Sequence, residues 1–251
     1  VAAARRAVDV GRMTDGERLA DALGVLAVVQ GDVPDEVGTL ATVEEALGLL
    51  RSTRSRAARV AVTSNLAHSL LNVGHPRQAL SLVEGVLEIA GGVGGAATVD
   101  FLLETAGWAA LACGQPHRAL GLYADVLAAL GAEAGLSQYG ISAALGAACA
   151  LVQIGDPTAG RAMEIAVRRL HASGFAVPPM IRGPLGRAET LLRATTEPTT
   201  PAIDGSQPDE GTWLLAAVTH AAHAVDPAGL TATPSADPAG LTATPSADPA
   251  G

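Results

Sequence analysis

The chain has 251 residues, of which 49% are apolar and only 2% aromatic, and its formal net charge is −9. This apolar fraction is enough to bury a sizeable core, and the acidic balance argues against direct contact with nucleic-acid phosphates. All 16 basic residues are arginine, which excludes a phosphate-binding loop of the Gly-Lys-Ser/Thr kind.

Apolar residues recur at helical spacing through most of the chain. Two stretches, Thr14–Glu17 and Thr42–Glu45, have the pattern of a capping box and support the starts of the first two predicted helices. No alternating apolar and polar run predicts a strand. The spacing therefore predicts an all-α protein, with helices at about 14–30, 40–52, 55–73, 76–90, 98–113, 116–130, 137–154 and 157–173.

A short motif repeats between these predicted helices. Gly74-His75-Pro76 recurs as Gly114-Gln115-Pro116 after 40 residues and as Gly155-Asp156-Pro157 after 41 more, and Gly31-Asp32-Val33-Pro34 is a degenerate earlier copy. Glycine supplies the left-handed cap that ends one helix, and proline suits the first turn of the next. Each unit is therefore predicted to be a helical hairpin, and such hairpins bury their apolar faces by stacking on one another.

The pattern weakens after Ser173. Pro178-Pro179 and Gly183-Pro184 are expected to interrupt any helix before a short one at about 185–194, and an 11-residue unit repeats from Asp226. The predicted regions are a helical array (1–175), a terminal capping region (176–194), a linker (195–211), a short helix (212–225) and a disordered tail (226–251).

The repeat pattern resembles the tetratricopeptide family over about residues 14–175. Leu103, Gly107, Ala119 and Tyr123 fall where that family has its first large residue, its glycine, its alanine and its aromatic residue. The resemblance implies a right-handed α-solenoid of antiparallel helix pairs, with a period of about 40 instead of the family's 34. The array is also similar to those of large LuxR-type transcriptional regulators, which join an ATPase, an array and a DNA-binding domain.

The same resemblance implies a concave groove, lined by the first helix of each pair, that binds a peptide or a partner helix. Tryptophan would supply contact area there, and asparagine would hold a peptide backbone. The alternative interpretation is that the tryptophan fills the core between two alanine-rich helices. By register, the residues expected to face the groove are Ser64, Asn65, His68, Asn72, Phe101, Glu104 and Trp108.

These observations favour a protein–protein interaction module that is not an enzyme and is a fragment of a larger regulatory protein. The alternative is a ligand-sensing array of a transcriptional regulator, or an accessory array of an enzyme whose active domain lies outside this chain. No catalytic, cofactor or metal site is predicted. Cys113 and Cys149 have no adjacent base, and His220 and His223 share a helix face without a third ligand.

Location and assembly are predicted from the same sequence. Both cysteines lie in apolar helical stretches, where reduced thiols act as small hydrophobes, so a cytoplasmic location is expected. The apolar runs are shorter than the roughly 20 residues that cross a bilayer, so no membrane contact is expected. A homodimer through the exposed end of the array, at residues 1–30, is an open alternative.

Overall fold

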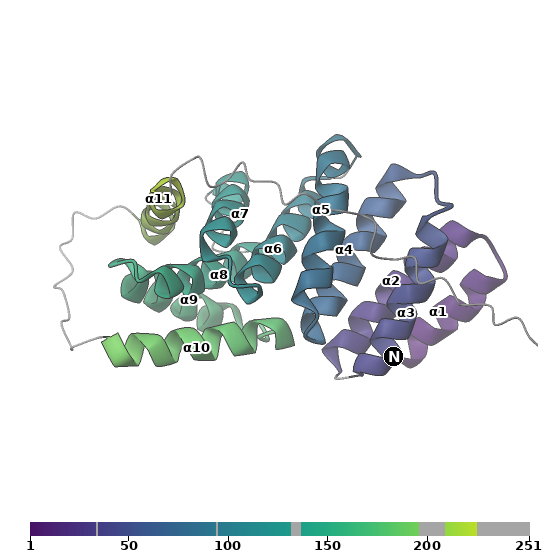
Figure 1. Cartoon of the computed structure of the whole chain (residues 1–251), viewed down its shortest axis with the longest axis horizontal. Helices are drawn as coiled ribbons and strands as arrows, with labels where there is room; N and C mark the ends of the chain where they lie inside the picture. The colour runs from purple at the N-terminus through teal and green to yellow at the C-terminus, as the bar shows by residue number, and fades with distance from the viewer. Residues whose placement is uncertain (34, 94, 132–136, 196–208, 225–251) are drawn as a thin grey trace, which may run out of the picture.

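A computed structural model describes residues 1–33, 35–93, 95–131, 137–195 and 209–224, and this part of the chain consists of helices without any strand. The helices stack side by side along the long axis of the molecule (Figure 1), which confirms the predicted all-α solenoid. They are α1 (Ala2–Arg12), α2 (Gly16–Asp32), α3 (Glu36–Leu50), α4 (Arg56–Asn72), α5 (Pro76–Val93), α6 (Ala96–Ala112), α7 (Pro116–Leu130), α8 (Gln138–Ile154), α9 (Ala159–Ser173), α10 (Pro179–Thr195) and α11 (Glu210–His223).

Four helical hairpins form the array: α2 with α3, α4 with α5, α6 with α7, and α8 with α9. The first helix of each hairpin also packs against the first helix of the next, in the order α2, α4, α6, α8. We call the surface formed by α4, α6 and α8 the first-helix face. It is the face on which the sequence predicts a groove.

The repeated turns have the geometry that the motif predicts. Gly74, Gly114 and Gly155 have φ angles of 89°, 76° and 72°, in the left-handed region where a side chain would be strained. After each glycine, the next backbone N–H donates to the carbonyl five residues earlier, as in His75 to Leu70 at 2.8 Å. The first two turns then place Pro76 and Pro116 at the start of the following helix.

The degenerate first copy of the motif behaves differently. Gly31 lies inside α2, where a Cβ would come within 3.2 Å of the Ser69 carbonyl oxygen, so this glycine permits close packing of α2 on α4. The capping box predicted at Thr42 is wrong, because α3 begins earlier, at Glu36, with Asp35 as its N-cap. The Thr42 hydroxyl instead donates to Gln30 in the interior.

Close packing at the centre of the array depends on two glycines around one aromatic ring. A Cβ added to Gly107 would lie 2.5 Å from a ring carbon of Tyr123, and one added to Gly146 would clash with the same ring. Tyr123 is fully buried. The glycine and the aromatic residue that carried the family resemblance are therefore in direct contact, between α6 and α7.

The region after the array differs from the prediction. Pro184 lies inside α10, so the expected interruption is absent and one helix spans Pro179–Thr195. The helix predicted near the C-terminal end is present as α11, which packs on α7. Figure 1 shows α10 and α11 on opposite sides of the array. Most of the predicted linker and all of the predicted disordered tail lie outside the described residues.

Candidate functional site

A row of rings crosses the first-helix face, with one residue from each of its helices. The ring centroids of His68 on α4 and Phe101 on α6 are 5.4 Å apart, and those of Phe101 and Tyr139 on α8 are 5.7 Å apart. All three side chains are partly exposed. We call these three residues the aromatic row. It spans three hairpins, and the Nδ1 atom of His68 is buried without a hydrogen-bond partner among the described residues.

A chain of buried polar groups lies next to this row, between α6 and α8. The indole N–H of Trp108 donates to the Ser142 hydroxyl at 3.0 Å, and that hydroxyl donates in turn to the Glu104 carboxylate. The Trp108 ring also meets Tyr123 edge-on, with centroids 5.8 Å apart. These contacts satisfy the indole N–H and place the ring against Tyr123, so Trp108 is part of the interior.

Three of the predicted groove residues therefore do not line an open surface. Trp108, Glu104 and Ser64 are 1%, 3% and 2% exposed. Trp108 and Glu104 are covered because α8 and α10 pack over their side of α6, and Ser64 donates back to the Val60 carbonyl of its own helix. In this structure Trp108 lies in the core, as the alternative interpretation of the sequence predicted.

The other four predicted residues are partly exposed on the first-helix face. His68 and Phe101 belong to the aromatic row, and Asn65 packs against α2, where its side-chain nitrogen would lie 3.5 Å from a Cβ at Gly24. Asn72 ends α4 and contacts two other helices, as described below. Of the seven residues that the sequence predicted for the groove, four are therefore partly exposed and three are buried.

Burial changes the titration of two groups at the site. It raises the pKa of Glu104 from 4.5 to about 7, and the hydrogen bond from Ser142 opposes the shift only in part. Burial also lowers the pKa of His68, against the nearby negative charge of Asp32. Both shifts favour the neutral forms, as expected where polar groups enter a low-dielectric interior.

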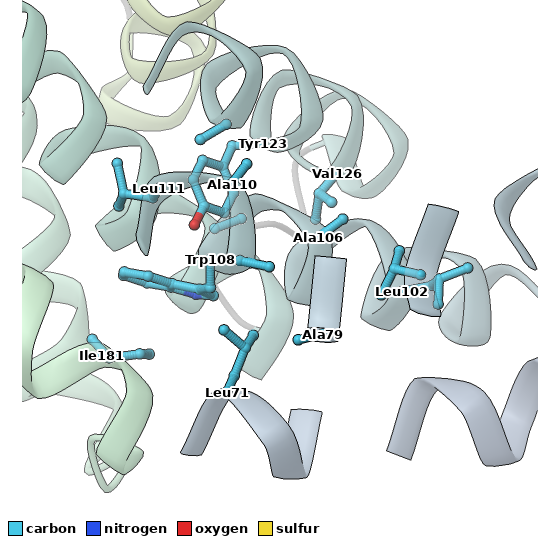
Figure 2. Close-up of a cluster of buried hydrophobic side chains, with 14 of the residues drawn as sticks. Leu71, Ala79, Leu102, Ala106, Trp108, Ala110, Leu111, Tyr123, Val126 and Ile181 are labelled. Atoms are coloured by element: carbon cyan, nitrogen blue, oxygen red, sulfur yellow. The ribbon is translucent and has the colours of Figure 1, made fainter. Parts of the chain in front are cut away.

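Asn72 joins the array to α10. Its side-chain nitrogen donates to Asp32 of α2 at 3.2 Å, and its side-chain oxygen accepts the backbone N–H of Met180 at 3.1 Å. The next residue, Ile181, is fully buried, and Figure 2 shows the Trp108 indole extending toward it from α6. The first-helix face thus already holds a helix, and the expected contact of Asn72 with a backbone is made to the chain's own α10.

Sequence reasoning missed three residues of this site. Tyr139 is the second residue of α8, outside the repeat register, and so carried no groove signal. Ser142 lay in a small-residue stretch typical of helix packing. Ile181 lay in a segment where proline and glycine predicted a break. A helical apolar spacing from Ile181 through Ala188 to Leu192 was the available signal for α10.

Outside the first-helix face, the histidines and cysteines are the remaining candidates for a functional site. No group of three or more metal-ligating side chains occurs within the described residues, and His223 bonds through Nδ1 to the Thr219 carbonyl of its own helix. Burial raises the pKa of the Cys149 thiol to about 12, which disfavours its reactive thiolate form. In the part of the chain that the structure describes, no helix has both the length and the apolar character needed to cross a membrane.

Comparison with known proteins gives a likeness in fold alone. No protein-family model matches the sequence, and no curated protein is similar to it in sequence. The crystal structure of BtubC (BKLC) from P. vanneervenii superposes with a TM-score of 0.54 at 17% sequence identity. The match covers 83% of this chain and 96% of that chain, so it extends over most of both molecules.

Proposed function

We propose that this chain is a protein–protein interaction module whose first-helix face binds a segment of a partner protein. The observation that carries the proposal is that α10 occupies this face through the two kinds of contact a bound helix would make. Asn72 accepts a backbone N–H from Met180, and Ile181 is a fully buried apolar anchor. A surface that holds one helix in this way has the shape and polarity to hold another.

The aromatic row supports the same proposal. Large aromatic side chains supply much of the binding energy at protein interfaces, because they bury a large area with few rotatable bonds. His68, Phe101 and Tyr139 come from three successive hairpins and are partly exposed. A partner segment lying along the row would contact all three at once.

The proposal also places the chain among the tetratricopeptide-like arrays, as part of a larger regulatory protein that acts in the cytoplasm. The contact between Gly107 and Tyr123, at two positions that carried the resemblance, supports the assignment to that repeat class. The repeated glycine-to-proline turns support it as well. The regulatory role rests on the similarity of the array to those of the LuxR-type regulators.

Site-specific photo-crosslinking in the native cell tests the function. Benzoylphenylalanine replaces Phe101 or Tyr139 in the aromatic row, and it replaces Glu88 of α5 or Ala128 of α7 in matched controls on exposed second-helix surfaces. We expect both row positions to crosslink to the same partner protein and the control positions to leave that partner unlabelled.

The Phe101→Ala variant completes this experiment. We expect it to reduce the Tyr139 crosslink while the circular dichroism spectrum stays unchanged, because a partly exposed ring contributes more to binding than to folding. Equal crosslinking from Glu88 and Tyr139, or no protein crosslink from the row, would remove the first-helix face as the binding surface.

A further inference from the structure

The position of α10 is unusual for a helix that follows the last hairpin of an array. A helix that continued the stacking would pack on α8 and α9, as α8 itself packs on both α6 and α7. Instead α10 lies mainly against α8 and also reaches α6 and α4. It therefore runs along the first-helix face across three hairpins, and Leu192 near its C-terminal end also lies beside Met163 and Val167 of α9.

The side chains of α10 have the spacing of a helix that binds in a groove. Ile181, Pro184 and Ala188 are buried, and Leu185 and Leu192 are half-buried beside them. These positions form a stripe with i, i+3 or i+4, i+7 and i+11 spacing, which is how amphipathic helices bind in a groove. The arginines of α10 are exposed: Arg182, Arg187 and Arg193.

The first turn of α10 meets a polar group on the array. The Met180 N–H is one of the donors that no residue within α10 can satisfy, and Asn72 accepts it. Asn72 in turn donates to Asp32, whose negative charge complements the positive end of the helix dipole. Asn72 and Asp32 interact only with a backbone N–H and with the helix dipole. They could therefore hold the N-terminus of any helix that lies on this face.

Three residues of α10 lower its intrinsic tendency to form a helix, and the packing of α10 explains neither of the two glycines among them. Gly183 and Gly186 favour the unfolded chain, and Pro184 removes one backbone hydrogen bond within the helix. Packing does not demand these glycines. A Cβ at Gly186 would meet nothing within 4 Å, and one at Gly183 would meet only an Arg187 side-chain nitrogen at 3.5 Å. A weak helix docked by one stripe is expected to open more readily than the array beneath it.

We propose that α10 is an exchangeable occupant of the first-helix face, and that an amphipathic helix of another protein replaces it. That helix would have the apolar spacing of α10 and would place its N-terminus at Asn72. The inference rests on the proposed function and names the partner class and the regulation of the same face. Because α10 competes in cis, the partner's apparent affinity is its intrinsic affinity multiplied by the fraction of chains in which α10 is open.

The chain carries its own reporter for the opening of α10. Cys149 on α8 is 0% exposed, and the charges of Arg187 and Glu189 on α10 act on its thiol, which places α10 close to it. In a full-length Cys113→Ala variant Cys149 is the sole thiol, so its rate of reaction with a maleimide measures opening. A buried thiol introduced by Val83→Cys on α5, with both native cysteines replaced by alanine, reports opening of the array instead.

Matched substitutions in α10 should move the Cys149 rate in opposite directions. Gly183→Ala and Gly186→Ala should each slow labelling roughly fivefold, because alanine favours the helix and meets open space. Ile181→Ala should accelerate labelling at least tenfold, because it removes the buried anchor. The Val83→Cys reporter should be unaffected by all three. If the labelling rates of Cys149 and of the Val83→Cys thiol changed by the same factor in every variant, α10 would not open separately from the array, and the exchange of α10 would be overturned.

Replacement by a helix in trans is measured by fluorescence anisotropy with a labelled peptide of residues 178–195. We expect the Ile181→Ala chain to bind this peptide at least tenfold more tightly than the wild type, and the chain with both glycines replaced to bind it more weakly. A peptide with Ile181→Asp and Ala188→Glu is the negative control and should not bind. Equal peptide binding by all chains would overturn the inference.

The two proposals can fail separately. If Phe101 and Tyr139 crosslink to a partner but the peptide does not bind, the interaction-module proposal stands and the exchange of α10 is overturned. Analytical ultracentrifugation at the same protein concentrations tests whether a second copy of this chain occupies the face instead. Dimers that form through α10 and disappear with Ile181→Asp would assign the face to a second copy of this chain and overturn the assignment to a different protein.

Discussion

At the scale of single residues, Trp108 separates the core from the candidate binding surface. Its ring is 1% exposed and packs against Tyr123, whereas Phe101, seven residues earlier on the same helix, is partly exposed. Both residues lie on one side of α6. The array therefore uses one end of this side for packing beneath α10 and leaves the other end open to solvent.

This difference predicts unequal losses of stability. Trp108→Ala should lower the free energy of unfolding by about 3–5 kcal/mol, because it leaves a large cavity and removes the donor to Ser142. Phe101→Ala should lower it by no more than about 1–2 kcal/mol, because less of its area is buried. Urea denaturation followed by circular dichroism measures both values, and equal losses would contradict this division of the helix.

Glu104 should give the protein an unusual dependence on pH. Its pKa is about 7 in the folded chain, above the usual 4.5, so the folded state binds more protons than the unfolded state between these values. The contribution of Glu104 to stability should therefore fall as pH rises from 4.5 to 7 and then stay level, whereas the lowered pKa of His68 acts in the opposite direction. The loss attributable to Glu104 at pH 8 is about 3 kcal/mol.

A pair of variants isolates this contribution. Urea denaturation at pH 5 and pH 8 should show a smaller loss on raising the pH for Glu104→Gln than for the wild type, because glutamine does not ionise. Glu88→Gln, on the exposed side of α5, should retain the wild-type difference. A Glu104→Gln variant with the same pH dependence as the wild type would show that the carboxyl group is not titrating in this range.

At the scale of helices, small residues determine how closely the hairpins approach. Gly107 on α6 and Gly146 on α8 face the Tyr123 ring of α7, so three helices meet where only a hydrogen atom fits. Some other helical glycines have no close neighbour. A Cβ at Gly85, on the exposed side of α5, would meet nothing within 4 Å.

Replacement by alanine is therefore expected to have opposite effects at Gly107 and at Gly85. Gly107→Ala should lower the free energy of unfolding by about 1–3 kcal/mol, because the added methyl overlaps Tyr123. Gly85→Ala should raise it by roughly 0.5–1 kcal/mol through helix propensity alone. Thermal denaturation checks the signs. Stabilisation by Gly107→Ala would mean that α6 and α7 separate easily at this point.

Helix α10 shows how packing can override local preference. Its glycines and its internal proline predicted a break after residue 178, yet α8, α6 and α4 support one continuous helix. The apolar stripe from Ile181 to Leu192 supplies enough buried contact for this. The same conflict between sequence and packing is the physical basis for proposing that α10 exchanges with a partner.

At the scale of the whole molecule, the segments after the array return to it on both sides. Helix α10 covers part of the first-helix face, and α11 packs on α7. Two contacts also join α11 to α9: the Arg161 guanidinium lies 4.2 Å from the centre of the Trp213 ring, and Arg168 pairs with Glu210 at 2.9 Å. The hairpins contact mainly their neighbours, so these two helices provide the longest-range contacts of the described chain.

The sequence alone determined the solenoid, because its signals are local. Helical periodicity, a left-handed glycine and a following proline act within a few residues, and they predicted the turns at Gly74, Gly114 and Gly155. The tertiary structure alone decided that Trp108 is buried, that Glu104 has a raised pKa and that α10 lies on the first-helix face. These properties depend on helices that are distant in the sequence. Trp108 and Glu104 are linked to Ser142 of α8, and α10 binds Asn72 of α4, so no local pattern encodes these pairings.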